Sequence, residues 1–135
     1  MMKVIVGDIT EVKHGYICHQ VNCKRVAGAG LALQIRRKWP DWYTHYLATK
    51  PVLGKADVYK VGNGLYVVSL YAQNGYGRAG RYTDYDALRK SLEAIKHLDD
   101  LYIPYGMGAG LAGGDWSMIL SILEEIVPHA TLVRL

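Results

Sequence analysis

Residues 108–116, GAGLAGGDW, lie between a short apolar run at 101–105 and an apolar, helical pattern at 116–126. The stretch carries the spacing G-x-G-x-x-G at Gly108, Gly110 and Gly113. Glycines at this spacing let a backbone approach a phosphate closely, although they also suit a tight connection that binds nothing. In α/β proteins such loops join a strand to a helix at the ligand-binding edge of the sheet. The stretch therefore predicts an α/β domain and leaves open whether this loop holds an anion.

Strand and helix patterns alternate along the rest of the chain. β-branched and aromatic runs predict strands at residues 3–6, 16–21, 56–61, 65–72, 101–105 and 130–135. Amphipathic or capped segments predict helices at residues 31–39, 41–50, 84–98 and 116–126. Pro40 should end the first helix, and Thr83 and Asp115 are the expected N-caps of the last two. Glycine and asparagine at 62–64 predict a β-hairpin. The order predicts one domain over residues 1–135, with a mixed sheet covered by helices on both faces.

Composition fits one globular domain. A chain of 135 residues, of which 50% are hydrophobic, is long enough to bury one core. Its longest apolar runs, such as LYVVSLYA, fall far short of the roughly 20 residues of a membrane-spanning helix, so we expect no membrane partner and a cytoplasmic location. Cys18 and Cys23 give no disulfide framework, which suits a reducing compartment. The net charge of +4 permits an anionic ligand without specifying one.

Unusual segments follow the predicted strands. Asp8 follows the first strand, and residues 22–30, 73–82 and 106–115 follow three others. Because ligands of open α/β sheets lie at the carboxyl ends of strands, two glycine-rich loops that enter helices there would hold a pyrophosphate from both sides. A dinucleotide-binding motif of the Rossmann type needs an acidic residue further on, where this chain reads VPHATLVRL, and a Walker A loop needs Lys where it has Asp115. Both nucleotide-binding classes are disfavoured.

With these segments in view, the chain resembles the macrodomain family of ADP-ribose-binding modules. The matching pieces are VGDIT at 6–10, HQVNCKRVAGAGLALQI at 19–35, LYAQ at 70–73, TDYDALRKSLEAI at 83–95 and IPYGMGAGLAGGDW at 103–116. The likeness covers nearly the whole length and is greatest to the small, phage-like or bacterial branch that includes ADP-ribose 1″-phosphate phosphatases. It implies a three-layer α/β/α macrodomain, with ADP-ribose or ADP-ribose 1″-phosphate as ligand and an ADP-ribosylated protein as a further partner.

The resemblance also implies roles for particular residues. Asp8 would bind the adenine amino group beside the Ile9 backbone, and Asn22 would line the distal ribose; without the resemblance Asp8 reads as a turn residue. The loops 26–30 and 108–113 would enclose the diphosphate. The implied ligand-binding residues are Asp8, Ile9, Asn22, Val26, Gly28, Ala29, Gly30, Gln73, Tyr105, Met107, Gly108, Ala109, Gly110, Leu111, Ala112 and Gly113.

His19 and Asp115 are the catalytic candidates, because the phosphatase branch uses a His and an Asp at matching positions. A histidine transfers protons near neutral pH and a carboxylate positions or activates water, so neither a metal nor a cofactor is expected. Each residue also has an ordinary structural reading, His19 as a half-buried strand residue and Asp115 as a helix N-cap.

Related activities remain as alternatives. The branch that removes ADP-ribose from protein glutamates uses a lysine and an aspartate where this chain has Gln73 and Ala112, so a lysine-dependent route is disfavoured. Another group of hydrolases carries a triple-glycine first loop, where this chain has Ala27-Gly28-Ala29-Gly30. A non-catalytic ADP-ribose reader and a hydrolase of protein or nucleic-acid adducts both stay open.

Three further features are weaker. Cys18, His19 and Cys23 lack a second pair of ligands at metal-site spacing, so no metal is expected. Residues 36–39 and Trp42 would suit a nucleic-acid face, but a solvated helix side with its tryptophans packed inward is favoured. The loop 74–82, with Tyr76, Arg78 and Tyr82, is expected to close over a ribose or adenine.

Overall fold

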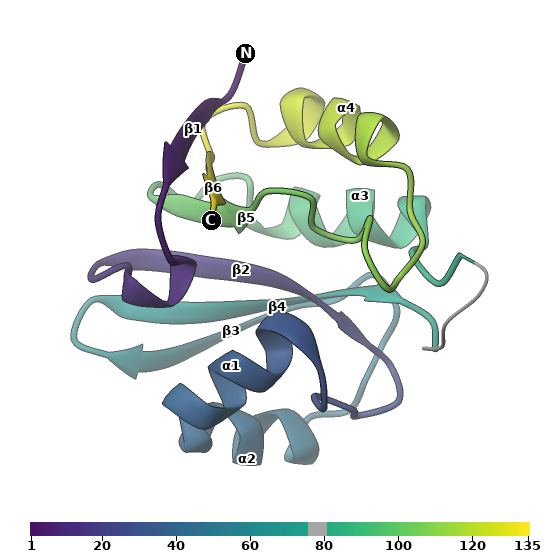
Figure 1. Ribbon diagram of the computed structural model, residues 1–135. Coiled ribbons are helices and arrows are strands. Elements are labelled where there is room, and N and C mark those ends of the chain that lie inside the picture. Colours follow the sequence, from purple (N-terminus) through teal and green to yellow (C-terminus); the bar gives the residue numbers. More distant parts are fainter. Residues whose placement is uncertain (76–80) are drawn as a thin grey trace.

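A six-stranded sheet runs between two layers of helices (Figure 1). The computed structural model describes residues 1–75 and 81–135, so Tyr76 and Arg78 of the expected closing loop lie outside the described residues. The strands lie in the order β1-β6-β5-β2-β4-β3. They span Lys3–Val6 (β1), Gly15–Asn22 (β2), Ala56–Gly62 (β3), Leu65–Gln73 (β4), Leu101–Pro104 (β5) and Thr131–Arg134 (β6). The β3–β4 hairpin is antiparallel and the other pairs are parallel, which confirms the expected mixed sheet.

Helices cover both faces of this sheet, which confirms the three-layer α/β/α architecture. They are α1 (Gly30–Lys38), α2 (Pro40–Ala48), α3 (Tyr85–Ile95) and α4 (Trp116–Ile126), with a short 3-10 helix η1 at Ile9–Glu11. Alternation along β4 explains the two cores, since Val67 and Tyr71 pack with α1 and α2 while Val68 and Leu70 pack with α3 and α4. Within the described ranges, no helix is both long and apolar enough to cross a membrane.

The helix ends correct one expectation and confirm another. Thr83 is not the N-cap of α3, because the Asp84 side chain takes that role and accepts from the Ala87 N–H at 2.9 Å. Thr83 instead pairs with Gln73 in an isolated β-bridge and is buried. Asp115 is the N-cap of α4, as expected, and accepts from the Ser117 N–H at 2.9 Å. Pro40 ends α1 by opening α2, with Trp39 as the shared cap residue.

Parallel pairing brings the carboxyl ends of five strands to one edge of the sheet. Asn22 and Gln73 pair at the ends of β2 and β4, and β5, which pairs with β2 at Tyr16 and Ile17, ends at Pro104 on the other side of β2. The segments that follow these strands therefore gather at this edge, although they are far apart in the sequence. Two of them, residues 23–29 and 105–115, lead into α1 and α4 and are named the first loop and the second loop below.

Replacement of the α3 cap tests this helix boundary. The Asp84→Ala variant should lower the free energy of unfolding by about 1 kcal/mol, because the Ala87 N–H loses its acceptor. Urea unfolding followed by circular dichroism measures the change. Asp86→Asn is the matched control, since Asp86 lies in the same turn without capping it and should cost only a few tenths of a kcal/mol. Equal losses in the two variants would contradict the assignment.

Candidate functional site

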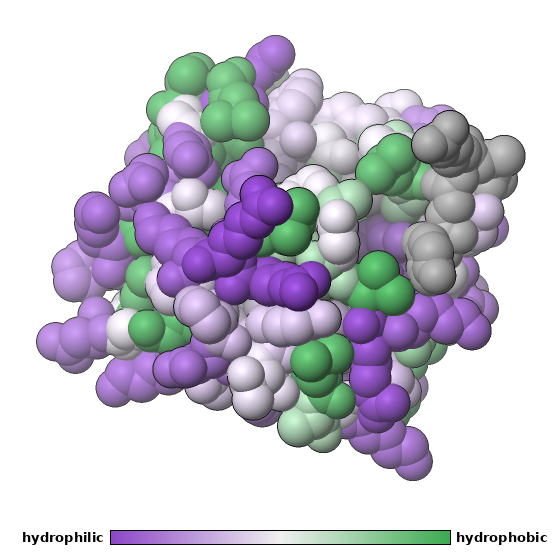
Figure 2. Space-filling model, turned by 60° about the horizontal axis from the view of Figure 1, so that its bottom comes forward, coloured by the Kyte–Doolittle hydropathy of each residue, from purple (hydrophilic) through white to green (hydrophobic). Residues whose placement is uncertain are grey.

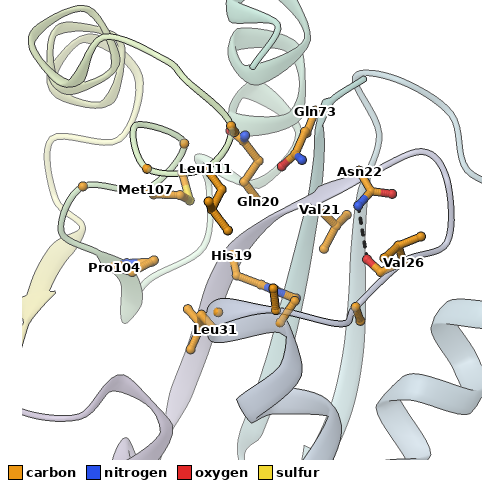
Figure 3. Close-up of a pocket in the computed structure, with 18 of the residues that line it drawn as sticks. His19, Gln20, Val21, Asn22, Val26, Leu31, Gln73, Pro104, Met107 and Leu111 are labelled. Atoms are coloured by element: carbon orange, nitrogen blue, oxygen red, sulfur yellow. Dashed lines mark hydrogen bonds between the residues drawn. The ribbon is translucent and has the colours of Figure 1, made fainter. Parts of the chain in front are cut away.

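A cavity of about 750 Å³ opens at the carboxyl edge of the sheet, between the first and second loops. This volume is typical of sites for small organic ligands. In Figure 3, Pro104 and Met107 lie on one side, Asn22 and Val26 on the other, and His19 between them. The described lining residues are His19, Gln20, Val21, Asn22, Val26, Ala27, Gly28, Ala29, Gly30, Leu31, Ala32, Gln73, Pro104, Tyr105, Gly106, Met107, Gly108, Gly110, Leu111 and Ala112.

Most of the expected binding residues meet at this cavity. Ala109 and Gly113 belong to the second loop but do not line it, and Asp8, Ile9 and Asp115 are also outside its wall. Gln20 was missed by the sequence reasoning. The available signal was its place two positions before Asn22 on the same strand, which puts both side chains on one face of the sheet.

Hydrogen bonds from β2 and α2 hold the first loop. Asn22 accepts from the Lys24 N–H at 2.8 Å and donates from Nδ2 to the Val26 carbonyl at 3.2 Å. The Tyr46 hydroxyl donates to the Asn22 carbonyl at 3.0 Å. Arg25 completes the turn at a φ of 56°, in the left-handed region that favours glycine. The Asn22 side chain therefore binds its own loop in this structure.

The start of α1 forms part of the cavity wall. Its N-cap residue, Ala29, provides no side-chain hydrogen bond, and the first helical residues Gly30 and Leu31 line the cavity. The first N–H groups of a helix lack partners within the helix and lie at the positive end of its dipole. This wall of the cavity is therefore suited to an anion.

The second loop is packed closely against the body of the protein. The Thr83 hydroxyl donates to the Gly108 carbonyl at 2.7 Å, and the Gly114 N–H donates to the same oxygen at 2.9 Å. Gly108 has a φ of 80°, and a Cβ there would lie 2.8 Å from Gln20 Oε1. A Cβ on Gly114 would lie 2.6 Å from the Gly108 carbonyl oxygen. The protein's own packing therefore requires glycine at both positions.

Gly28 and Gly110 differ, since neither φ lies in the left-handed region and neither position is crowded. Among the described residues, the nearest atom to a Cβ on Gly28 would be Val26 Cγ1 at 4.0 Å, and a Cβ on Gly110 would meet no heavy atom within 4 Å. Both residues line the cavity. Nothing in the described protein demands glycine at these two positions, which leaves their backbone open to a close neighbour from outside.

His19 lies in the cavity wall but is only 2% exposed. The Trp42 indole N–H donates to Ser69 Oγ at 3.1 Å, and Ser69 Oγ lies 3.4 Å from His19 Nε2. Burial lowers the pKa of His19 from its ordinary value of 6.5 to about 3, so the ring is neutral at neutral pH. No Lys, Arg, Asp or Glu is among the described lining residues. The cavity therefore presents dipoles and apolar groups in place of charged side chains.

The acidic candidates, Asp8 and Asp115, are not among the described residues that line this cavity. Asp115 is exposed, and hydrogen bonds from the Ser117 side chain and backbone hold the pKa of its carboxyl below the usual value. Asp8 is also exposed and accepts from the Thr10 N–H at 2.9 Å and hydroxyl at 2.7 Å, which lowers its pKa in the same way. Ile9 is buried in the α1–α2 core. The structure thus does not bring Asp115 together with His19 in the cavity, nor Asp8 and Ile9 into its wall.

The structure also shows where the residues of the possible nucleic-acid face and metal site lie. Trp42 is fully buried, and Arg36 packs over the Tyr43 ring at 4.0 Å from its centroid. On the face shown in Figure 2, hydrophilic residues are widespread and hydrophobic residues form separate small groups. Across residues 1–75 and 81–135, no group of three His, Cys, Asp or Glu side chains is arranged to hold a metal ion.

Fold and cavity together define a three-layer α/β/α domain with a ligand cavity at the carboxyl edge of its sheet. Neither a protein-family model nor a curated protein sequence matches the chain. Among solved structures it is similar to a protein of unknown function from Bacteroides thetaiotaomicron, at 26% identity and a TM-score of 0.85, covering 100% of this chain and 98% of the other.

Structures of macrodomains are also similar to the chain. The macrodomain of Thermus aquaticus DarG matches at 20% identity and a TM-score of 0.81, covering 100% of this chain and 98% of the other. Thermosipho africanus DarTG in complex with ADP-ribose matches at 17% identity and a TM-score of 0.75, covering 100% of this chain and 42% of the other. The chain has the macrodomain fold.

The buried histidine predicts a pH dependence of stability. A base whose pKa is lower in the folded state contributes stability above its unfolded pKa, and that contribution is lost as the pH falls toward the folded pKa. As the pH falls from 6.5 to 4.5, wild type should therefore lose on the order of 1 kcal/mol per pH unit more than His19→Gln. Urea unfolding of both proteins at pH 7.5 and 4.5 measures the difference. Parallel pH profiles would show that His19 titrates normally in the folded protein.

Proposed function

We propose that this protein binds ADP-ribose in the cavity between the first and second loops, with the diphosphate held by backbone N–H groups. The observation that carries the proposal is that Gly28 and Gly110 line the cavity from opposite loops, and that no crowding by the described residues and no left-handed φ requires glycine at either position. A phosphate bound close to the backbone would explain why these two positions carry glycine, since a side chain there would collide with it. The ADP-ribose complex of the similar DarTG structure supports the choice of ligand.

Electrostatics of the cavity agree with an anion bound by dipoles. The N-terminus of α1 has no side-chain cap and lines the cavity, while charged side chains are missing from its described lining. A helix N-terminus and successive backbone N–H groups bind phosphate without a cationic partner. The apolar part of the lining, including Leu31, Pro104 and Met107, suits the faces of a base and a ribose.

Glycine substitutions separate ligand contact from folding. Gly28→Ala and Gly110→Ala should lower the affinity for ADP-ribose about tenfold or more, because each methyl group enters the space of the diphosphate. Both should keep or slightly raise the free energy of unfolding, since alanine is unstrained at these positions. Isothermal titration calorimetry and urea unfolding give the two quantities.

Gly108→Ala is the matched control for these variants. It should destabilise the protein by about 1–3 kcal/mol, because its φ of 80° and close neighbours oppose a side chain. If Gly28→Ala and Gly110→Ala bind ADP-ribose as wild type does, the placement of the diphosphate is wrong.

The more specific candidate is hydrolysis of ADP-ribose 1″-phosphate to ADP-ribose and inorganic phosphate. In this proposal Asp115 accepts a proton from the water that attacks phosphorus, the bond between phosphorus and the ribose oxygen breaks, and the leaving ribose oxygen takes a proton from His19, which regains one from solvent. The observation that favours it is the position of His19 in the cavity wall. His19 is 2% exposed and Asp115 is not among the described lining residues, so this chemistry requires the phosphate to come within reach of both side chains.

Lysine-based removal of ADP-ribose from an acceptor has weaker support. Gln73 and Ala112 both line the cavity, and the Gln73 amide donates to the Gly75 carbonyl at 2.8 Å. Neither side chain carries an amine that would form a Schiff base. A reader function and hydrolysis of other ADP-ribosyl bonds are therefore the competing outcomes of the test.

A phosphorus NMR time course with ADP-ribose 1″-phosphate distinguishes these outcomes. The phosphatase proposal predicts growth of inorganic phosphate, with a rate about 100-fold lower in His19→Gln and Asp115→Asn, which both retain ADP-ribose binding. Asn at 115 keeps the helix cap and removes only the carboxylate. Normal turnover in both variants would overturn the mechanism. Broadened diphosphate signals with a persistent phosphomonoester would leave binding intact and reject the phosphatase.

A further inference from the structure

We propose that Thr83 is a positioning residue that holds the second loop against β2, and that it sets the affinity of the cavity without touching the ligand. Thr83 is 2% exposed and is not among the lining residues. The part of this inference that concerns affinity rests on the proposed binding of ADP-ribose. The part that concerns the loop can be tested in the free protein.

A side-chain relay fixes the second loop at Gly108. Gln20 Nε2, on β2, donates to Thr83 Oγ1 at 2.9 Å, and Thr83 Oγ1 donates to the Gly108 carbonyl at 2.7 Å. Figure 3 shows Gln20 reaching from β2 toward this loop. One hydroxyl thus uses both its acceptor and its donor capacity, which sets the direction of each bond. Such bonds are electrostatically stronger in a buried setting than in water.

Backbone hydrogen bonds fix the loop a few residues later. The N–H groups of Tyr82 and Thr83 donate to the Ala112 carbonyl at 2.7 and 3.1 Å. Thr83 also pairs with Gln73 at the end of β4. The segment 108–112 of the second loop is therefore tied at both ends to Thr83, which is itself tied to β2 and β4.

Close packing around Thr83 means that its hydrogen bonds can be tested only with side chains of similar size. Cβ atoms placed on Gly108 and Gly114 would lie 3.2 Å from Thr83 Oγ1 and Thr83 Cβ respectively, so this side chain leaves little space. Valine has nearly the same shape and lacks the hydroxyl, whereas serine keeps the hydroxyl and loses only a methyl group. If Thr83→Ser behaves like wild type and Thr83→Val does not, the hydrogen bonds of the hydroxyl matter and not only the volume of the side chain.

A second buried hydroxyl supplies a comparison on the opposite wall. Tyr46 is 1% exposed, and its hydroxyl donates to the Asn22 carbonyl at 3.0 Å beneath the first loop. Tyr46→Phe removes this bond and keeps the ring. It should loosen the first loop and leave the second unchanged, which makes it the matched control for Thr83→Val.

The experiment compares wild type, Thr83→Val, Thr83→Ser and Tyr46→Phe, first without ligand. Amide spectra and hydrogen exchange should show changes at residues 108–113 in Thr83→Val, near-wild-type behaviour in Thr83→Ser, and changes confined to 22–30 in Tyr46→Phe. With ADP-ribose, Thr83→Val should bind about five- to tenfold more weakly, the size expected for one lost hydrogen bond, and Thr83→Ser should recover most of the affinity.

Two results would overturn the inference. One is an unchanged second loop in Thr83→Val; the other is a change spread over the whole chain, which would indicate a general loss of stability. Full affinity for ADP-ribose despite a loosened loop would reject the affinity part. If wild type itself fails to bind ADP-ribose, the proposed function fails, and the amide measurements still decide the role of Thr83.

Discussion

The carboxyl end of β2 determines how the two walls of the cavity lie relative to each other. Within three residues this strand supplies Gln20, which holds the second loop through Thr83, and Asn22, which holds the first loop directly. Gln20 and Asn22 both lie in the part of β2 that pairs with β4, opposite Leu70 and Gln73, so both amides project from a hydrogen-bonded strand. The walls are therefore positioned by a common strand, although they belong to segments about 80 residues apart.

A cavity built in this way would bind an anion without a charged side chain in its described lining. Its described lining has no ionised side chain, and His19 is neutral because it is buried. An anion held there would rely on oriented backbone N–H groups, which need no reorganisation when the ligand arrives. The positive net charge of the chain would then raise the rate at which an anionic ligand reaches the protein more than it would stabilise the bound complex. The same neutrality makes proton transfer the most demanding part of any catalytic role for His19.

Local sequence patterns predicted the architecture well, because alternation along β4 and amphipathic spacing in the helices are short-range properties. The Asp115 cap was predictable for the same reason. Thr83 was assigned as a cap because its actual partners, Gln20 and Gly108, are 63 and 25 residues away. The burial of His19 was equally hidden, since it depends on Trp42 and Ser69 from other elements. Positions of Asp8 and Asp115 relative to the cavity depend on how whole elements pack, which a local pattern does not specify.

An NMR titration of the isotope-labelled protein with ADP-ribose, in which the backbone amide signals are followed, tests most directly whether both loops enclose the diphosphate. If both loops enclose the diphosphate, amides at residues 26–30 and 108–113 should shift together and saturate at the same ligand concentration. Amides at the opposite edge of the sheet, such as Gly64 and Asp100, should stay in place. Shifts in only one loop, shifts elsewhere, or no shifts at millimolar ADP-ribose would contradict the account.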